Sequence, residues 1–232
     1  MSKMGISVLK KKSMKAEIEV LQPGLFSSLQ DSGRKGFMEY GVPVSGARES
    51  YASGMANLLL QKSPDAVVME ITQLGPKLKF MASTQIVISG ADLSPVINGK
   101  PIENNRVYNI HADDVLGFGK RITGCRAYLA VKGGFKTESF LNSCSWYPGI
   151  TAHTRLEKGM KLEYEITSVG KESTHAGIKT DDYLTSEIVE TFPGPEFDLF
   201  SEAEKKILQN SAFSIDKNNN RMGIQLQEEL HN

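Results

Sequence analysis

Residues 67 to 166 form a series of short apolar segments separated by turn residues, and this pattern strongly limits the possible folds. Asn98-Gly99 favours a two-residue hairpin turn. In the last segment Leu162 and Tyr164 alternate with charged residues, which is typical of a strand with one solvent-exposed face. We therefore predict an antiparallel barrel or sandwich. The predicted strands are residues 67–72, 77–81, 85–89, 106–110, 115–118, 126–131 and 161–166.

The first part of the chain predicts one strand and one helix. The strand covers residues 16–20 and ends before the turn at Pro23-Gly24. The helix begins at Ala47, with Glu49 in the first turn, where a negative charge favours the helix dipole. Its apolar positions recur at helical spacing, and we expect its methionine and leucines to lie in the core. These positions are Ala47, Tyr51, Met55, Leu58 and Leu59.

Two polar loops lie between that strand and that helix. The first reads Gln30-Asp31-Ser32-Gly33-Arg34-Lys35-Gly36, and the second covers residues 41–49. Together they place glycines suited to positive φ, two acids, an arginine and a hydroxyl next to one rigid helix. Such loops are common places for binding and catalysis, so we predict a site there.

The C-terminal part predicts a second, smaller unit. A strand at residues 187–192, a turn at 193–195 and a helix with the capping box Ser201 and Glu204 precede a last strand near Ile224 and Leu226. These elements are too few to cover their own apolar faces. The predicted organisation is a disordered extension (1–13), a first lobe (14–168), a linker (169–185) and a partial second lobe (186–232).

Composition argues against several classes of protein. Lys+Arg and Asp+Glu are both 27, so no excess of basic charge favours nucleic acid as a partner. The two cysteines show no CxxC spacing and the four histidines are scattered, so we predict no metal site and expect Cys125 and Cys144 to be reduced core thiols. No apolar segment is long enough for a membrane span. We expect a soluble, cytoplasmic protein.

Asp31, Arg34 and Glu49 are the candidate catalytic residues. Arg34 can bind a carboxylate or phosphate with two parallel hydrogen bonds. The two acids can act as a base for water or hold Mg²⁺, and the N–H groups at the helix start can receive an anion. The alternative is structural: a salt bridge from Arg34 to one of the acids would join the loop to the helix.

Other polar residues have both a functional and a structural interpretation. Asp92 follows a strand, so it either points into the same cleft or forms an Asx-turn. Glu70 lies in an apolar segment and needs either a partner or a solvent-exposed face. Ser45 lacks the surroundings of a nucleophile, and helix capping is the favoured interpretation. No phosphate-binding glycine motif occurs, including the near match at residues 117–120.

Taken in order, the motifs resemble the family of the C-type subunit of 5-oxoprolinase. The family includes the Kip antagonist protein, the so-called allophanate hydrolase subunit 2 and part of the biotin-dependent urea carboxyltransferase domain. The resemblance covers about residues 14–223 and rests on the two loops described above and on six further segments. These segments are residues 55–59, 89–95, 98–99, 125–134, 193–195 and 220–223.

The resemblance implies a mainly β protein with a few helices: a cyclophilin-like β-barrel lobe plus an incomplete, related second lobe. It implies the C-type component of an ATP-dependent 5-oxoprolinase, which opens the lactam of 5-oxo-L-proline to glutamate together with a Kip inhibitor-like B-type subunit and an A-type subunit. ATP with Mg²⁺ would be shared with a partner protein. The substrate-binding residues would be Gln30, Gly33, Ser45, Gly46, Asn57 and Asp92.

Two departures from the family pattern stand out. Glu49 replaces the usual aspartate, and full family members continue past Arg221-Met222-Gly223, so we expect a C-terminally truncated chain that is inactive alone. Two alternatives share the same fold. One is a carboxyltransferase-type module that uses carboxybiotin, and the other is a non-catalytic antagonist that binds a Kip-type kinase inhibitor.

Overall fold

The computed structural model describes residues 15–166, 186, 188, 190–218 and 223–228. The chain divides into two compact units, residues 1–184 and 185–232, and each is described by itself. The predicted extension (1–13) and linker (169–185) lie outside the described residues. The predicted organisation into an extension, a first lobe, a linker and a related second lobe stays a prediction.

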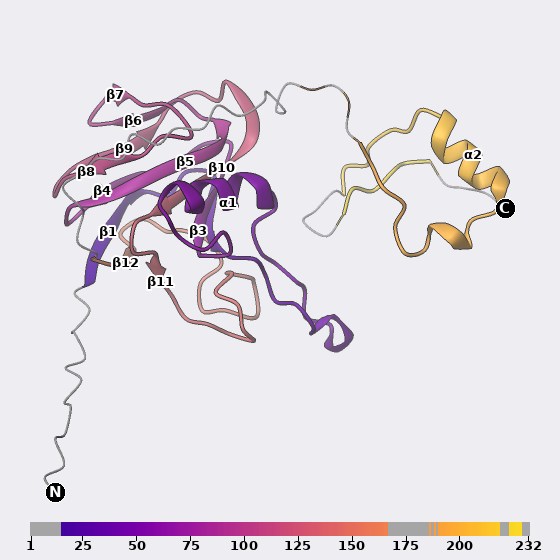
Figure 1. Ribbon diagram of the computed structural model, residues 1–232, viewed down its shortest axis with the longest axis horizontal. Coiled ribbons are helices and arrows are strands. Elements are labelled where there is room, and N and C mark those ends of the chain that lie inside the picture. The colour runs from indigo at the N-terminus through magenta and orange to yellow at the C-terminus, as the bar shows by residue number, and fades with distance from the viewer. Residues whose placement is uncertain (1–14, 167–185, 187, 189, 219–222, 229–232) are drawn as a thin grey trace, which may run out of the picture. The chain divides into compact units, whose positions relative to one another are not determined.

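Two antiparallel sheets make up the first unit (Figure 1). The seven-stranded sheet has the order β11 (Phe135–Lys136), β12 (Lys161–Glu165), β1 (Lys15–Gln22), β4 (Lys77–Phe80), β9 (Val115–Phe118), β6 (Pro95–Ile97) and β7 (Lys100–Pro101). The five-stranded sheet has the order β2 (Phe26–Gln30), β3 (Val68–Thr72), β10 (Thr123–Val131), β5 (Thr84–Asp92) and β8 (Tyr108–Ile110).

The mainly β prediction is confirmed, but the strands do not close into one barrel. Each sheet ends in edge strands, and the edge at β2 is covered by a loop of the same unit. Trp146 N donates to the Leu29 carbonyl at 2.9 Å, and Leu156 N donates to the Ser27 carbonyl at 2.7 Å. Because these bonds use the outward carbonyls of β2, a loop takes the place of a further strand.

The strands predicted in the first unit are found, and three of them, β1, β5 and β10, are longer than predicted. The hairpin at Asn98-Gly99 joins β6 to β7, and both turn residues have positive φ, as this type of turn requires. β5 and β10 run further than predicted because Gly90 lets them approach: a Cβ built on it would lie 2.6 Å from the Arg126 carbonyl. β2 and β11 were not predicted as strands.

The main core lies between the two sheets. Side chains alternate along β10, so that Ala127, Leu129 and Val131 join this core, whereas Tyr128 and Ala130 face the other side. The sequence predicted the same periodicity of two for the strand at residues 161–166. Fully buried core residues include Ile18, Val20, Leu78, Phe80, Met69, Ile71, Ile86 and Leu116.

Helix α1 (Ser50–Leu59) covers the outer face of the five-stranded sheet (Figure 1). The predicted start at Ala47 is wrong, because the N–H groups of residues 47–49 bond to other parts of the unit. Glu49 is therefore the N-cap, with extended backbone, and not a first-turn residue. Leu58 is 54% exposed, which corrects its predicted core position, because the face toward the sheet is formed by Ala52, Ala56 and Leu59.

The second unit holds little regular structure. It contains a 3-10 helix, η2 (Phe197–Leu199), and α2 (Glu202–Asn210), whose predicted capping box is present. Within the described residues, positions 188 and 190–192 are not strand, which contradicts the strand predicted at 187–192. Near the predicted last strand, Leu226 forms an isolated bridge with Ile215, and Met222 lies outside the described residues.

Neither helix in the described ranges is long and apolar enough to cross a membrane. Cys125 and Cys144 are free and only half-buried, so the prediction that they are core residues is wrong.

Candidate functional site

Asp31 follows β2 directly, and its carboxylate connects two loops of the first unit. Oδ1 accepts hydrogen bonds from Gly33 N at 2.8 Å, Ser143 Oγ at 2.7 Å and Ser145 Oγ at 2.6 Å. Oδ2 accepts from Cys144 N at 2.5 Å. The three residues at 143–145 come from the loop after β11, which is more than one hundred positions away along the chain.

These hydrogen bonds keep Asp31 ionised. Burial by itself raises the pKa of this carboxyl, but the bonds from the two serine hydroxyls and two backbone N–H groups outweigh it, so the pKa lies below its ordinary value. The carboxylate therefore acts as a charged acceptor that orders the loop after β11. Oδ2 accepts a single hydrogen bond here, which leaves room for one from a ligand.

Arg34 is completely buried, at 0% exposure, and is directed at the same loop. Its Nε donates to the Phe140 carbonyl at 3.2 Å, Nη2 to the Ser145 carbonyl and Nη1 to Ser45 Oγ at 3.1 Å. The guanidinium thus contacts two carbonyls and a hydroxyl instead of a carboxylate. The structural alternative of a salt bridge to Asp31 or Glu49 is therefore wrong, although a structural role is present.

Gly33 and Gly46 let the two polar loops pack backbone against backbone. Both have positive φ, at 90° and 85°. A Cβ on Gly33 would lie 2.7 Å from the Val44 carbonyl oxygen, and one on Gly46 would lie 3.0 Å from Gly33 N. Arg34 N donates to the same Val44 carbonyl at 2.5 Å. Any other residue at either position would push the loops apart.

A second buried carboxylate, Glu70 on β3, holds the segment before α1. Its Oε2 accepts from Arg48 N at 2.7 Å and from the Tyr128 hydroxyl at 3.1 Å. The Tyr128 hydroxyl in turn accepts from Glu49 N at 3.0 Å. Arg126 Nε lies 3.8 Å from Glu70 Oε1, so of the two interpretations of Glu70 the one with a partner is confirmed. Burial and the Glu70 charge raise the pKa of Tyr128 well above its ordinary value.

These contacts occupy the N–H groups of residues 47–49, where the sequence placed the helix start, and an anion site at the observed start of α1 stays a prediction. The N–H groups of Arg48 and Glu49 bond to the Glu70 carboxylate and the Tyr128 hydroxyl, and Ala47 N donates to the Asp31 carbonyl at 2.8 Å. These three N–H groups are already hydrogen-bonded within the protein, as backbone N–H groups away from water must be. They do not face an incoming anion.

A hollow of about 240 Å³ nevertheless separates the Asp31 loop from α1. The ammonium of exposed Lys35 has no partner among the described residues and supplies a positive charge at this hollow. Opposite charge comes from Asp31 and Asp65, and hydroxyls come from serines. The lining residues are Asp31, Ser32, Lys35, Ala47, Ser50, Ser53, Pro64, Asp65, Ala66 and Val68.

Two further residues predicted to bind substrate, Asn57 and Gln30, are buried and hold the structure around the hollow. Asn57 is buried, and its Nδ2 donates to the carbonyls of Pro64 and Ala66 at 3.3 and 2.7 Å, so it supports one wall of the hollow. Gln30 is buried beneath the loops and donates to Ser28 Oγ and the Trp146 carbonyl. In this structure both residues support the site indirectly, because their hydrogen bonds fix neighbouring backbone and side chains.

Ser45 and Asp92 have local roles. Ser45 accepts a hydrogen bond from Arg34 and has positive φ, whereas the α1 N-cap is Glu49, so the capping interpretation of Ser45 is wrong. Asp92 Oδ1 accepts from Ser94 N at 2.8 Å, which confirms the Asx-turn, and Asp92 does not line the hollow. The roles predicted for these residues toward a ligand stay predictions.

A larger hollow of about 730 Å³ lies beside the seven-stranded sheet. Its lining includes Leu74, Val96 and Phe118, and Lys77 is its one charged side chain among the described residues. Because it lacks paired polar groups, the smaller hollow is the better candidate for chemistry.

Comparison with known proteins decides the family. Residues 40–232 match the family model described as "Carboxyltransferase domain, subdomain A and B". The chain belongs to this carboxyltransferase family. The resemblance to the C-type subunit of 5-oxoprolinase and its relatives in urea carboxylation is thereby confirmed.

Curated relatives include proteins of two kinds. The C subunit of 5-oxoprolinase from Escherichia coli is 26% identical over 219 residues, which are 92% of this chain and 69% of that protein. The urea amidolyase of Lachancea kluyveri is 39% identical over 130 residues, which are 56% of this chain. The chain spans only 7% of the length of that urea amidolyase.

Solved structures support the fold. The crystal structure of TTHA0988 superposes with a TM-score of 0.75 at 23% identity, covering 90% of this chain and 77% of that one. The K. lactis urea amidolyase superposes with a TM-score of 0.72 at 29% identity, covering 96% of this chain and 14% of that one. At such identities the first likeness speaks for the fold alone.

In this carboxyltransferase-family chain, sequence reasoning missed the groups that complete the polar network. Ser143 and Ser145 lie in a loop without a recognisable motif. The spacing Ser-x-Ser, downstream of the turn at Gly133-Gly134, was a weak signal of a polar site. Tyr128 lies in the middle of an apolar strand and pairs across the sheet with Glu70. Lys35 was overlooked because it stands beside the more conspicuous Arg34.

Proposed function

We propose that the chain is the C-type subunit of an ATP-dependent 5-oxoprolinase and acts on 5-oxo-L-proline together with B-type and A-type partners. The observation that carries this proposal is the similarity to the E. coli C subunit, which spans 92% of this chain and 69% of that protein. The match covers most of the length of a separate protein, which supports a role as one component of a complex.

The hollow beside α1 is the proposed substrate site. Its volume of about 240 Å³ suits a small ring compound. In this proposal the Lys35 ammonium binds the carboxylate of 5-oxoproline, and Asp31 Oδ2 accepts the lactam N–H. Glu49, which lies between the lining residues Ala47 and Ser50, is the proposed base for the attacking water.

In the same proposal Arg34 acts as a positioning residue. Its guanidinium fixes Ser45 and the loop after β11, and that loop in turn supplies the donors to Asp31. An amide is poorly reactive, so ring opening needs stabilised negative charge on the oxygen. Asp31 is an acceptor and does not supply that stabilisation, so its rigid placement serves to orient the lactam N–H.

The described residues do not fit ATP. A triphosphate normally binds to several free backbone N–H groups and several cations, whereas here the N–H groups of Gly33, Arg34 and Ala47 are bonded within the protein, and Lys35 is the one basic residue among those that line the hollow. No cluster of three or more metal-ligating side chains occurs in the described part of the chain. We therefore propose that a partner protein holds ATP.

Reconstitution tests the proposal. The chain is mixed with its B-type and A-type partners, and consumption of ATP and 5-oxoproline is measured. Lys35→Met should raise KM about tenfold or more, because a charge-assisted contact is lost. Lys100→Met, which changes another exposed lysine, serves as the matched control. A wild-type mixture that consumes no 5-oxoproline would reject the proposal.

The second candidate is a carboxyltransferase-type module that uses carboxybiotin. The 39% identity to the L. kluyveri urea amidolyase over 130 residues favours it. It predicts binding of a biotinylated carrier protein, which can be measured by calorimetry with the unbiotinylated carrier as control. Undetectable affinity for the biotinylated form would count against this candidate.

A further inference from the structure

Two lysines join the end of α1 to the end of β10 by reciprocal contacts. Lys62 lies just after the helix, and its Nζ donates to the Val131 carbonyl on β10 at 3.1 Å. Lys132 lies just after the strand, and its Nζ donates to the Leu60 carbonyl at the helix end at 2.7 Å. Each ammonium thus has one backbone acceptor and further N–H bonds to spare.

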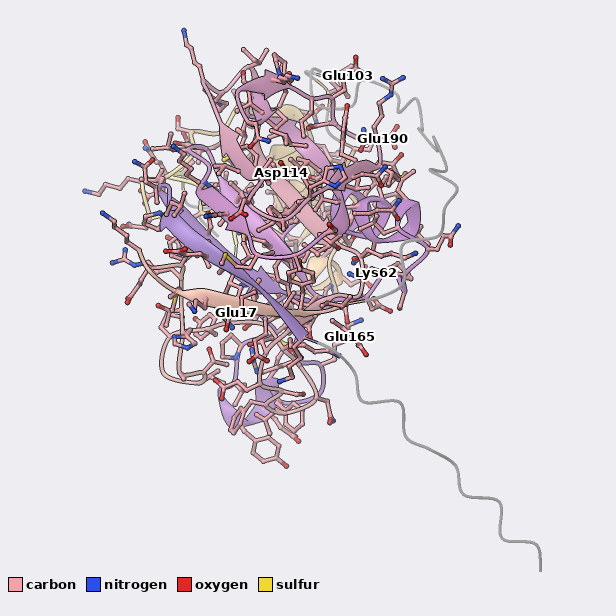
Figure 2. The ribbon with its side chains drawn as sticks, turned by 90° about the vertical axis from the view of Figure 1, so that its left-hand side faces the viewer. Glu17, Lys62, Glu103, Asp114, Glu165 and Glu190 are labelled. Atoms are coloured by element: carbon pink, nitrogen blue, oxygen red, sulfur yellow. The ribbon has the colours of Figure 1, made fainter. Side chains whose placement is uncertain are left out.

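Neither lysine contacts a carboxylate among the residues that the structure describes. Glu165 lies on the same side of the first unit as Lys62 in Figure 2, but its Oε2 forms an ion pair with Lys136 Nζ at 2.8 Å. Two neighbouring positive charges therefore meet without a negative partner in the described structure. Such an arrangement favours loss of one proton.

The surroundings of Lys62 favour the neutral amine. Burial, and then the charge of Lys132, lower the pKa of Lys62 to about 8. At neutral pH about one in ten of these side chains is then uncharged, against roughly one in three thousand for an ordinary lysine. The free amine is the nucleophilic form.

Gly134 leaves space beside this amine. A Cβ built there would lie 3.6 Å from Lys62 Nζ and 3.7 Å from its Cε, with no other contact within 4 Å. The site is half-buried, so a small uncharged electrophile suits it better than a bulky one.

We propose that Lys62 is a site of reversible carboxylation by carbon dioxide, with Lys132 as the counter-ion of the product. The Nζ lone pair of the neutral amine attacks the carbon of CO₂, an N–C bond forms, and one C–O π bond breaks to place the electron pair on oxygen. The nitrogen then releases one proton to water. The product is a carbamate with one negative charge.

The charge change explains why CO₂ is favoured over other carbonyl compounds. Carboxylation converts a repelling pair of cations into an attracting pair, because the carbamate can bond to the spare N–H groups of Lys132. An imine formed with an uncharged aldehyde or ketone would carry no negative charge, so Lys132 would not stabilise it. This inference is independent of the proposed 5-oxoprolinase activity, and it needs no partner protein.

Carbon-13 NMR of the full chain equilibrated with labelled bicarbonate and CO₂ near pH 8 tests the proposal. We expect one carbamate signal beyond that of the N-terminal amine. It should vanish in both Lys62→Met and Lys62→Arg, of which the second keeps the charge if the first fails to fold. The Lys100→Met control should keep the signal.

The partner lysine gives a sharper test. Lys132→Met should weaken the Lys62 signal about tenfold, since it removes both the activating charge and the counter-ion, whereas Lys132→Arg should retain most of it. Absence of the signal in the wild type, its persistence in either Lys62 variant, or equal signals in the two Lys132 variants would overturn the proposal.

Discussion

The first unit buries its apolar side chains, whereas the described part of the second unit leaves its own largely exposed. Ile18, Leu78 and Phe80 are fully buried between two sheets. In the second unit Phe192 is 87% exposed and Leu199 is 83% exposed. The difference shows that local sequence signals, such as the capping box of α2, are enough to form a helix but not to form a buried core.

The cause lies in the range of the contacts. Strands of the first unit pair with partners far along the chain, as when β1 pairs with β12 and β4. In the second unit the described contacts are mostly local: the capping box of α2, the Lys205 ammonium 5.6 Å from the Phe197 ring, and one isolated bridge. Short elements with local contacts have too little apolar area to bury.

The largest predicted effect is in the polar network of the first unit. Arg34→Met should lower the free energy of unfolding by about 4 kcal/mol, because the buried Ser145 carbonyl and the part-buried Phe140 carbonyl lose their donors. Denaturant unfolding of the full chain measures this. Arg106→Met, at an exposed arginine, should change little, and hydrogen exchange of α2 should be the same in both variants. Equal stability of Arg34→Met and the wild type would contradict the buried network.

A paired core substitution compares the two units directly. Ile88→Ala should cost about 3–4 kcal/mol, since it leaves a cavity between the sheets. Ile207→Ala on α2 should cost less than about 0.5 kcal/mol, because that side chain is 42% exposed. Unfolding curves monitored by circular dichroism give both values. A large loss in Ile207→Ala would show that the second unit has a core of its own.

Lys62 predicts a pH dependence within the first unit. Its folded pKa is about 8 and its unfolded pKa is near 10.5, so between these values the unfolded chain binds more protons and stability rises with pH. Lys62→Met should remove this rise, a difference of about 2–3 kcal/mol across that window. Below pH 8 the variant should be the more stable chain. Parallel pH profiles of the two proteins would contradict the lowered pKa.

The smallest predicted effect is local to α2. Ser201→Ala should destabilise the helix by about 1 kcal/mol, because the N-cap bond to Glu204 N is lost. Hydrogen exchange of the α2 amides measures it, with Ser211→Ala at the other end of the helix as the control. Protection in the first unit should not change. A global loss of stability would mean that the two units unfold together.

The sequence predicted the strands of the first unit well because their pattern is local. Alternation at Leu162 and Tyr164, and the turn at Asn98-Gly99, appear in the structure at the expected places. The helix start was misplaced because the residues before Ser50 bond to Glu70 and Tyr128, which are distant in sequence. The density of polar residues at Asp31 and Arg34 was visible, but their partners were not.

By itself the sequence determined most strands of the first unit, where glycines permit tight loops, and that α2 has a capping box, since each of these depends on neighbouring residues. Only the tertiary structure decided that Arg34 is buried and bonded to carbonyls, and that Asp31 meets Ser143 and Ser145. It also decided that Lys62 and Lys132 meet. The direction of a polar side chain depends on which distant backbone packs beside it, and no local pattern contains that information.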